Sequence, residues 1–312
     1  MTFNIFSFSS LILAVTSAIL ILILSVYGKS RLHKVSVLFN SAIGLWGLGG
    51  IFLGQIQDEH LALVVWRWVN IAVIFIAIFN YHVVYLLCSL KNKKILFLIY
   101  LQGIIFSIFS AISPLLIPRV RYVFNSFYFD TPGPLYYLFF AIWLLIVCYS
   151  HFLLLKGFLT SQGKLRNQIL YFLVGTALGF SGGITNFLPA LGIDFYPFGN
   201  FTIPIYTLII TYAILRYRLL DISVAITRTG IFVAVYSIVL GIPFALAFGW
   251  REQLQLSMGE TWWLVPLISS TVLATVGPSI YLYIQRRAED RLLQEQRRYQ
   301  TTLRRASLGM GR

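Results

Sequence analysis

Nine apolar segments constrain the fold of this chain more than any other feature. They comprise residues 4–27, 36–54, 64–88, 95–117, 135–155, 169–191, 201–215, 231–248 and 263–284. A helix needs about 20 apolar residues to cross a bilayer, and the shortest segment, 201–215, can extend at either end. Charged residues make up 11% of the chain, against about 25% in soluble domains. The sequence therefore predicts an all-α, polytopic membrane helix bundle of about nine transmembrane helices.

The positions of Lys and Arg predict how these helices are oriented. Cytoplasmic loops of membrane proteins carry an excess of basic residues. The 24 Lys and Arg residues lie in the odd-numbered loops and the C-terminal tail, except for Arg67, Arg119, Arg121 and Arg251. The opposite side holds six acids, Asp58, Glu59, Asp130, Asp194, Glu252 and Glu260. We predict a cytoplasmic tail and an N-terminus outside the cytoplasm.

Composition argues against several classes of function. The net charge of +14 comes from short clusters rather than a continuous basic face, so nucleic acid is not an expected partner. Cys88 and Cys148 lie inside apolar segments and cannot build a metal cluster. His82 and His151 lie on separate segments without nearby acids, so we expect interhelical hydrogen bonds and neither a metal nor a cofactor. Since no acid lies within a segment, proton-coupled transport is disfavoured.

Small residues recur on the sixth segment. Gly175, Gly179 and Gly183 are four residues apart, the spacing at which membrane helices pack closely. The same stretch places Ser181 in a GxSxG pattern typical of serine hydrolases. That chemistry needs a base, and no His follows His151. We expect helix packing here and no catalytic residue.

Arg67 marks a candidate site near the outer end of the third segment. It lies between Trp66 and Trp68, and Asn70 follows one turn later. An ionisable group at membrane depth suggests function, so Arg67 would bind an anionic ligand or pair with an acid such as Asp194. Alternatively, Arg67 reaches the lipid headgroups while the Trp residues anchor the interface.

The outer turn after the sixth segment is a second candidate region. Asn186 and Asn200 lie there with Pro189 and Pro204. The prolines either simply end or kink helices, or the turn caps a pocket that opens outward. The loop 118–134 before the fifth segment is rich in aromatics. If the turn caps a pocket, we expect an unknown small ligand, amphipathic or anionic, to contact Trp66, Arg67, Asn70, Asn186 and Asn200.

The tail from residue 285 to 306 predicts a polar helix that continues the ninth segment. Such a helix can carry rotation, piston motion or tilt out of the membrane. Its apolar positions are spaced near the heptad of a coiled coil, so we predict a homodimer through Leu292, Tyr299, Leu303 and Ala306.

The chain also resembles a known family. The matching stretches are GITNFLPALGI (183–193), YPFGN (196–200) and YAILRYRLLDI (212–222). They are similar to the end of the N-terminal seven-helix region of bacterial sensor histidine kinases, and the resemblance covers roughly residues 10 to 225. In that family a run like the one here closes the seventh helix on the cytoplasmic side, which implies a signalling motif of Arg216, Tyr217, Arg218, Leu219, Leu220 and Asp221.

The resemblance implies a sensor in the bacterial plasma (inner) membrane, joined to a cytoplasmic kinase or other output domain. Residues 1–225 would form the seven-helix sensor domain, 226–284 an added two-helix hairpin, and 285–312 a cytoplasmic signalling helix. The chain lacks the phosphoacceptor and ATP-binding motifs of a kinase, so we do not expect it to be an enzyme. Expected partners are the lipid bilayer, a second copy, the output domain and a small ligand. The alternative is a small-molecule transporter or permease, although no internal repeat supports it.

Overall fold

The computed structural model describes residues 4–28, 30–217, 235–236, 238–243, 247 and 251–309. The chain divides into two compact units, Met1–Ile222 and Ser223–Arg312, and each is described by itself. The three-part division into residues 1–225, 226–284 and 285–312 stays a prediction.

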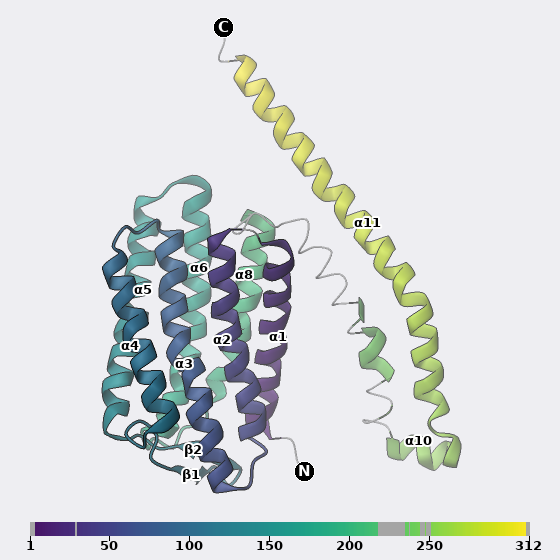
Figure 1. Cartoon of the computed structure of the whole chain (residues 1–312). Helices are drawn as coiled ribbons and strands as arrows, with labels where there is room; N and C mark the ends of the chain where they lie inside the picture. Colours follow the sequence, from purple (N-terminus) through teal and green to yellow (C-terminus); the bar gives the residue numbers. More distant parts are fainter. Residues whose placement is uncertain are drawn as a thin grey trace. The chain divides into compact units, whose positions relative to one another are not determined.

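The first unit is a bundle of long helices that lie side by side (Figure 1). Its helices are α1 (Ile5–Tyr27), α2 (Arg31–Leu53), α3 (Glu59–Leu87), α4 (Lys93–Ile112), α5 (Pro134–Thr160), α6 (Gly163–Gly183), α7 (Phe187–Ala190) and α8 (Ile203–Tyr217), with 3-10 turns η1 (Ile184–Asn186) and η2 (Phe198–Thr202). Across the described residues, seven helices are long and apolar enough to cross a membrane, six of them in this unit. The all-α, polytopic membrane bundle is thus confirmed.

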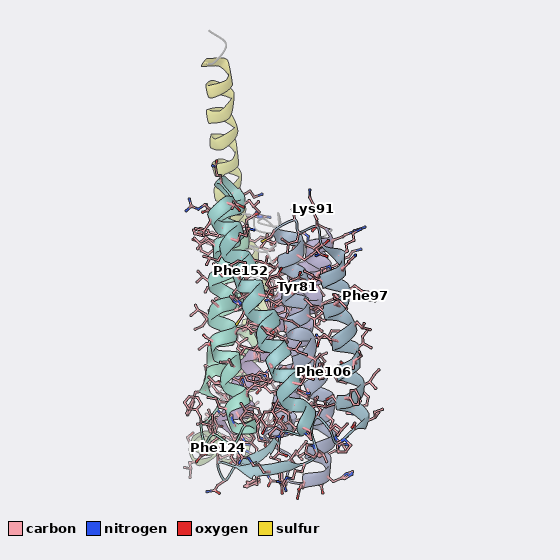
Figure 2. The ribbon with its side chains drawn as sticks, turned by 90° about the vertical axis from the view of Figure 1, so that its left-hand side faces the viewer. Tyr81, Lys91, Phe97, Phe106, Phe124 and Phe152 are labelled. Carbon is pink, nitrogen blue, oxygen red and sulfur yellow. The ribbon has the colours of Figure 1, made fainter. Side chains whose placement is uncertain are left out.

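The outer surface of the bundle is apolar around its middle. Phe97 and Phe152 are 65% and 59% exposed and point away from the helices (Figure 2). Lys91, in a basic loop, and Phe124, in the loop before α5, mark opposite ends of the bundle (Figure 2). An apolar surface of this kind is solvated by lipid tails, whereas the two ends meet water and headgroups.

Helices α2 and α3 begin earlier than their apolar segments. The side chain of Ser30 accepts a hydrogen bond from the backbone of His33, and that of Asp58 accepts one from Leu61. Such caps satisfy backbone N–H groups of the first helical turn. The helices therefore start at Arg31 and Glu59, although the first turns are polar.

Small residues bring neighbouring helices together. A Cβ atom added to Gly47 of α2 would lie 2.8 Å from the backbone nitrogen of Ala14 in α1. On α6, Cβ atoms at Gly175 and Gly179 would lie 3.4 and 3.3 Å from Tyr206 of α8. The packing role predicted for the α6 glycines is confirmed for Gly175 and Gly179, whereas a Cβ at Gly183 would lie 3.9 Å from Ile203, an ordinary contact. Ser181 is exposed and its hydroxyl donates to the Leu178 carbonyl of its own helix.

A β-hairpin follows the fourth helix, which ends earlier than predicted. Helix α4 stops at Ile112 rather than 117, because Pro114 disfavours a helical conformation for the residue before it. The chain then forms β1 (Val120–Val123) and β2 (Phe127–Asp130), which pair antiparallel with Val120 opposite Asp130. The prediction of an aromatic loop missed these strands.

The second unit contains α10 (Arg251–Met258), a 3-10 turn η3 (Gly259–Thr261) and α11 (Leu264–Gly309). Helix α11 has 46 residues with Pro278 inside it, so the predicted continuity of the ninth segment and the tail is confirmed. Half of the eighth segment lies outside the described residues, and the count of nine helices stays a prediction. Leu292, Tyr299, Leu303 and Ala306 all lie on α11, and their side chains fall outside the described part.

The close approach of α1 and α2 predicts the effect of a single methyl group. We expect Gly47→Ala to lower the free energy of unfolding by about 1–3 kcal/mol, because the new Cβ meets backbone atoms that cannot rotate away. Gly44→Ala is the matched control: its Cβ would lie 3.4 Å from Ser17, an ordinary contact. Unfolding by SDS in mixed micelles measures the free energy of unfolding of both variants. Equal stabilities would contradict the packing described.

Candidate functional site

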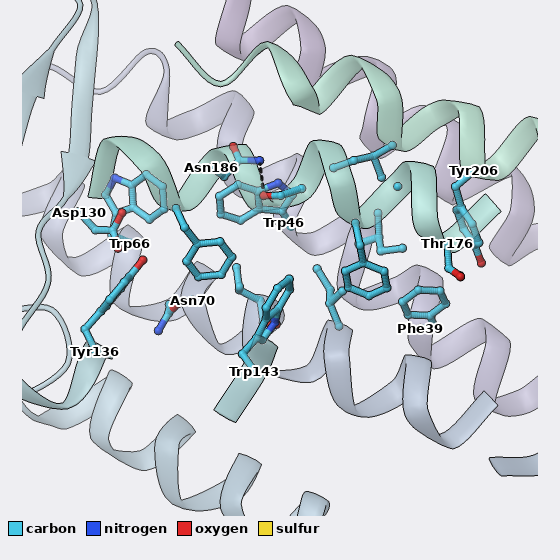
Figure 3. A pocket seen from close by; sticks show the side chains of 18 residues that line it. Phe39, Trp46, Trp66, Asn70, Asp130, Tyr136, Trp143, Thr176, Asn186 and Tyr206 are labelled. Atoms are coloured by element: carbon cyan, nitrogen blue, oxygen red, sulfur yellow. Dashed lines mark hydrogen bonds between the residues drawn. The ribbon is translucent and has the colours of Figure 1, made fainter. Parts of the chain in front are cut away.

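A pocket lies inside the first unit, among α2, α3, α5, α6 and α8. Its empty volume is about 740 Å³, including the open space at its mouth. Small-molecule sites are commonly lined by apolar and aromatic side chains with a few polar groups, and this pocket has that character (Figure 3). The lining residues are Phe39, Ile43, Trp46, Trp66, Asn70, Val73, Ile76, Asp130, Tyr136, Trp143, Thr176, Gly179, Phe180, Gly183, Asn186, Phe187, Ile203 and Tyr206.

Hydrogen bonds to the backbone fix two of the tryptophan rings. The indole N–H of Trp66 donates to the Tyr128 carbonyl at 2.9 Å. That of Trp143 donates to the Val73 carbonyl of α3 at 3.0 Å. Because each polar edge has a partner, the apolar faces of the rings are left to line the pocket.

The β-hairpin packs against the bundle beside this pocket. The ring of Phe127 stacks on Phe6 of α1 at 4.5 Å between centroids, and Phe129 lies 4.6 Å from Trp66. The Arg121 guanidinium donates to the Pro189 carbonyl of α7. The hairpin thereby joins segments that are far apart in the sequence (Figure 1).

The loop between α7 and η2 covers the turn of the hairpin. Phe124 and Asn125 have φ values of 52° and 47°, the left-handed conformation that bulky residues rarely adopt. The Tyr196 ring lies 5.0 Å from Phe124, and its hydroxyl hydrogen-bonds to the backbone of Phe6. Burial raises the pKa of Tyr196, so this hydroxyl keeps its proton. These contacts hold the strained turn against the bundle.

Asp130, at the end of β2, is the buried acid of the pocket. It is 2% exposed. It accepts hydrogen bonds from the Tyr136 hydroxyl and from its own backbone N–H, and Figure 3 shows that hydroxyl directed toward it. Burial raises the pKa of Asp130 to about 7, although these hydrogen bonds and the charge of Arg121 oppose the shift. Near neutral pH the pocket thus contains a carboxyl group that can gain or lose its proton.

Asp130 was not predicted as a site residue, because from the sequence it is only one of the outer acids. It lies outside the apolar segments, so the statement that no segment contains an acid holds. The inference that the bundle lacks a carboxyl group for proton-coupled transport does not hold, because the hairpin brings this acid into the pocket. The sequence signal was the run of three aromatic residues, Phe127–Phe129, a residue type enriched in strands, directly before Asp130.

Three of the five predicted ligand-binding residues line the pocket: Trp66, Asn70 and Asn186. Asn200 is fully buried behind it, where its side-chain oxygen accepts a hydrogen bond of 2.8 Å from Asn186. Arg67 does not line the pocket. Its Nε and Nη2 atoms both donate to the Ile117 carbonyl at 3.1 Å, and Asp194 is exposed. Arg67 thus fastens the chain just before the hairpin. Its predicted role in ligand binding is untested.

None of the other predicted site residues that the structure describes in the first unit lines the pocket. Arg216 and Tyr217 end α8, whereas Arg218, Leu219, Leu220 and Asp221 fall outside the described residues. His82 makes the expected interhelical hydrogen bond, 2.7 Å long, to Tyr100. The expectation for His151 is wrong, because its Nδ1 atom bonds to Val147 of the same helix. Among the described residues, no group of three or more His, Cys, Asp or Glu could hold a metal.

The raised pKa of Asp130 predicts a pH dependence of stability. Between about pH 4 and pH 7 the unfolded chain has lost this proton while the folded protein keeps it, so stability falls as the pH rises. Asp130→Asn removes this loss. We expect the variant to gain stability over the wild type, by about 2–3 kcal/mol more at pH 8 than at pH 5. Thermal unfolding at the two pH values measures this difference. A gain that does not depend on pH would contradict the burial of the carboxyl.

One comparison with known proteins identifies a family. The family model described as the N-terminal 7TM region of histidine kinase matches residues 10–223. Neither the comparison with curated proteins nor that with solved structures gives a match. The matched region is the sensory input part of a membrane-bound histidine kinase rather than its catalytic part. It spans most of the chain and agrees with the resemblance seen in residues 183–222. This multi-pass membrane protein therefore belongs to the family of N-terminal seven-transmembrane regions of histidine kinases.

Proposed function

We propose that this chain is a sensory input module that detects a small molecule in its membrane-embedded pocket and relays the signal through a cytoplasmic helix to a kinase-type output domain. Family membership supports the input role. The pocket carries the ligand part of the proposal, since it combines aromatic walls with few polar groups. The proposed location is the bacterial inner membrane, with the hairpin outside and the basic loops in the cytoplasm.

Helix α8 offers a route from the pocket to the proposed signalling motif. Ile203 and Tyr206 of α8 line the pocket, and the helix ends at Tyr217, within the motif 216–221. The distance along the helix from Tyr206 to Arg216 is about 15 Å. An occupant that displaces Tyr206 would therefore move the motif through a single rigid element.

Helix α11 is suited to the final step. It continues without a break from the apolar stretch Leu264–Arg286 to Gly309. A rotation or tilt imposed on the membrane part is transmitted along such a helix, whereas a flexible linker would absorb it. Pro278 removes one backbone hydrogen bond and is a point where the helix can bend.

Transport remains the second candidate function, because Asp130 supplies a buried carboxyl of the kind that proton-coupled carriers use. The coding region downstream of Arg312 discriminates the two. An in-frame kinase or cyclase domain supports the sensor. A stop codon followed by transport genes favours the transporter.

The relay proposal predicts that kinase control depends on the rotational orientation of α11 relative to the membrane part. We would join residues 1–312 to the cytoplasmic half of a histidine kinase and insert alanines after Arg286. Two or five added residues turn the following helix by close to half a circle relative to the membrane part, and seven nearly restore its orientation. We expect the shorter insertions to invert or abolish kinase control and the seven-residue insertion to retain it. The autophosphorylation rate in membrane vesicles measures the effect. The same regulation in all variants would contradict a helical relay.

The proposed homodimer predicts disulfide crosslinks along one stripe of α11. In a background without Cys88 and Cys148, cysteines at Leu292 or Tyr299 should give crosslinked dimers in oxidised membranes. Cysteines at Gln294 or Thr301, about 200° further round the helix, are the matched controls. Gel electrophoresis without reductant reads the result. Equal crosslinking at all four positions, or none at any, would contradict a dimer through the stripe.

A further inference from the structure

The pocket contains a carboxyl group that lacks a cationic partner. Asp130 is 2% exposed, and in the described part of the chain no cation forms an ion pair with it. Arg121, the cation that acts on it, is exposed and already donates to Pro189. A carboxylate offers about four acceptor positions, and the hydrogen bonds from Tyr136 and the backbone use two of them. A buried charge of this kind is costly unless it is paired.

The other polar groups around the pocket have already used most of their donors. Both amide hydrogens of Asn186 are taken, by Gly183 and Asn200, and its side-chain oxygen has no partner. Asn70 donates to Ser110. The remaining donors with partners are the Trp66 and Trp143 indoles, the Thr176 hydroxyl and the Tyr136 hydroxyl. Among the described residues, the Trp46 indole N–H and one amide hydrogen of Asn70 remain as donors, whereas the Asp130 carboxylate is the acceptor that carries charge.

The aromatic walls of the pocket favour an occupant that carries a positive charge. Trp46 and Trp66 lie 5.8 Å apart between ring centroids, and Figure 3 shows Trp66 beside Asp130 at the end of the pocket that the hairpin borders. The face of a tryptophan ring attracts cations, most strongly where water is excluded. An anion would meet acceptors and ring faces, and Arg67 does not line the pocket to compensate for this.

We propose that the pocket binds an organic ammonium, a molecule whose protonated amine docks on Asp130 and whose apolar or aromatic body lies among the tryptophan rings. This rests on the proposed sensory function and names the class of its ligand. The ammonium supplies the donors and the charge that the Asp130 carboxylate lacks, and the body occupies the apolar remainder of the cavity. The anionic ligand considered from the sequence is disfavoured.

Matched probes that differ only in their polar group test this. We would titrate phenethylamine, phenethyl alcohol and phenylacetate, and the corresponding naphthylethyl series, into the purified chain in nanodiscs at pH 8 by calorimetry, with empty nanodiscs as the blank. We expect the amine of at least one series to bind at least tenfold more tightly than its alcohol, and neither carboxylate to bind. Equal binding of amine and alcohol, preference for a carboxylate, or no saturable binding by either amine would overturn the proposal.

Variants then assign the preference to Asp130. Asp130→Asn keeps the shape of the side chain and should remove the tenfold preference for the amine while alcohol binding persists, which also reports that the pocket is intact. Asp194→Asn, which changes an exposed acid, should bind as the wild type does. An amine preference that survives in Asp130→Asn would overturn the proposal.

A measurement on the unaltered chain does not depend on the variants. As the pH falls from 8 to 5, Asp130 gains its proton, so amine affinity should fall at least tenfold while alcohol affinity stays constant. Amine affinity that is constant over this range would contradict the assignment. If the amine binds as expected but kinase control in the chimera does not respond to it, the pocket assignment stands and the proposed sensing role fails.

Discussion

The docking of the β-hairpin on the helix bundle is the interaction on which the candidate site depends. It rests on aromatic contacts and on hydrogen bonds to backbone carbonyls, notably Phe127 with Phe6, Trp66 with Tyr128 and Arg121 with Pro189. Arg67 fastens the segment just before the hairpin to α3 through the Ile117 carbonyl. Without this docking the pocket would lose Asp130 and its hydrogen bond with Tyr136. A loop outside the apolar segments thus supplies the only acid among the residues that line the pocket.

The helices beneath the hairpin associate by a different physical principle. Lipid tails are as apolar as the side chains that face them, so close packing rather than water exclusion brings membrane helices together. Gly47 lets α1 and α2 approach at the backbone, and Gly175 and Gly179 do the same for α6 and α8. Gly179 borders the pocket as well, and the larger rings of Trp46 and Trp143 form its walls. Pocket and close packing are therefore complementary parts of one bundle, and α8 belongs to both.

Much of the fold was predictable, because length, apolarity and charge asymmetry are local signals. They identified the long helices, the glycine packing of α6 and the continuity of α11. The hairpin was missed because four-residue strands rich in aromatics resemble an interfacial loop. Trp66, Asn70 and Asn186 were recognised as unusual for their positions, whereas Asp130 looked like an ordinary loop acid. Only long-range contacts, such as that between Phe129 and Trp66, reveal that it is buried.

The hairpin holds one buried carboxyl group against the pocket, and no cation among the described residues forms an ion pair with it. Infrared difference spectroscopy between pH 8 and pH 5, on the chain in nanodiscs, observes that group directly through the carbonyl stretch of a protonated carboxylic acid. We expect a band that appears as the pH falls through neutrality, in line with a pKa of about 7, and that is absent in Asp130→Asn. A band that titrates only in the ordinary range of aspartic acid, near pH 4, or that persists in the variant, would contradict this expectation.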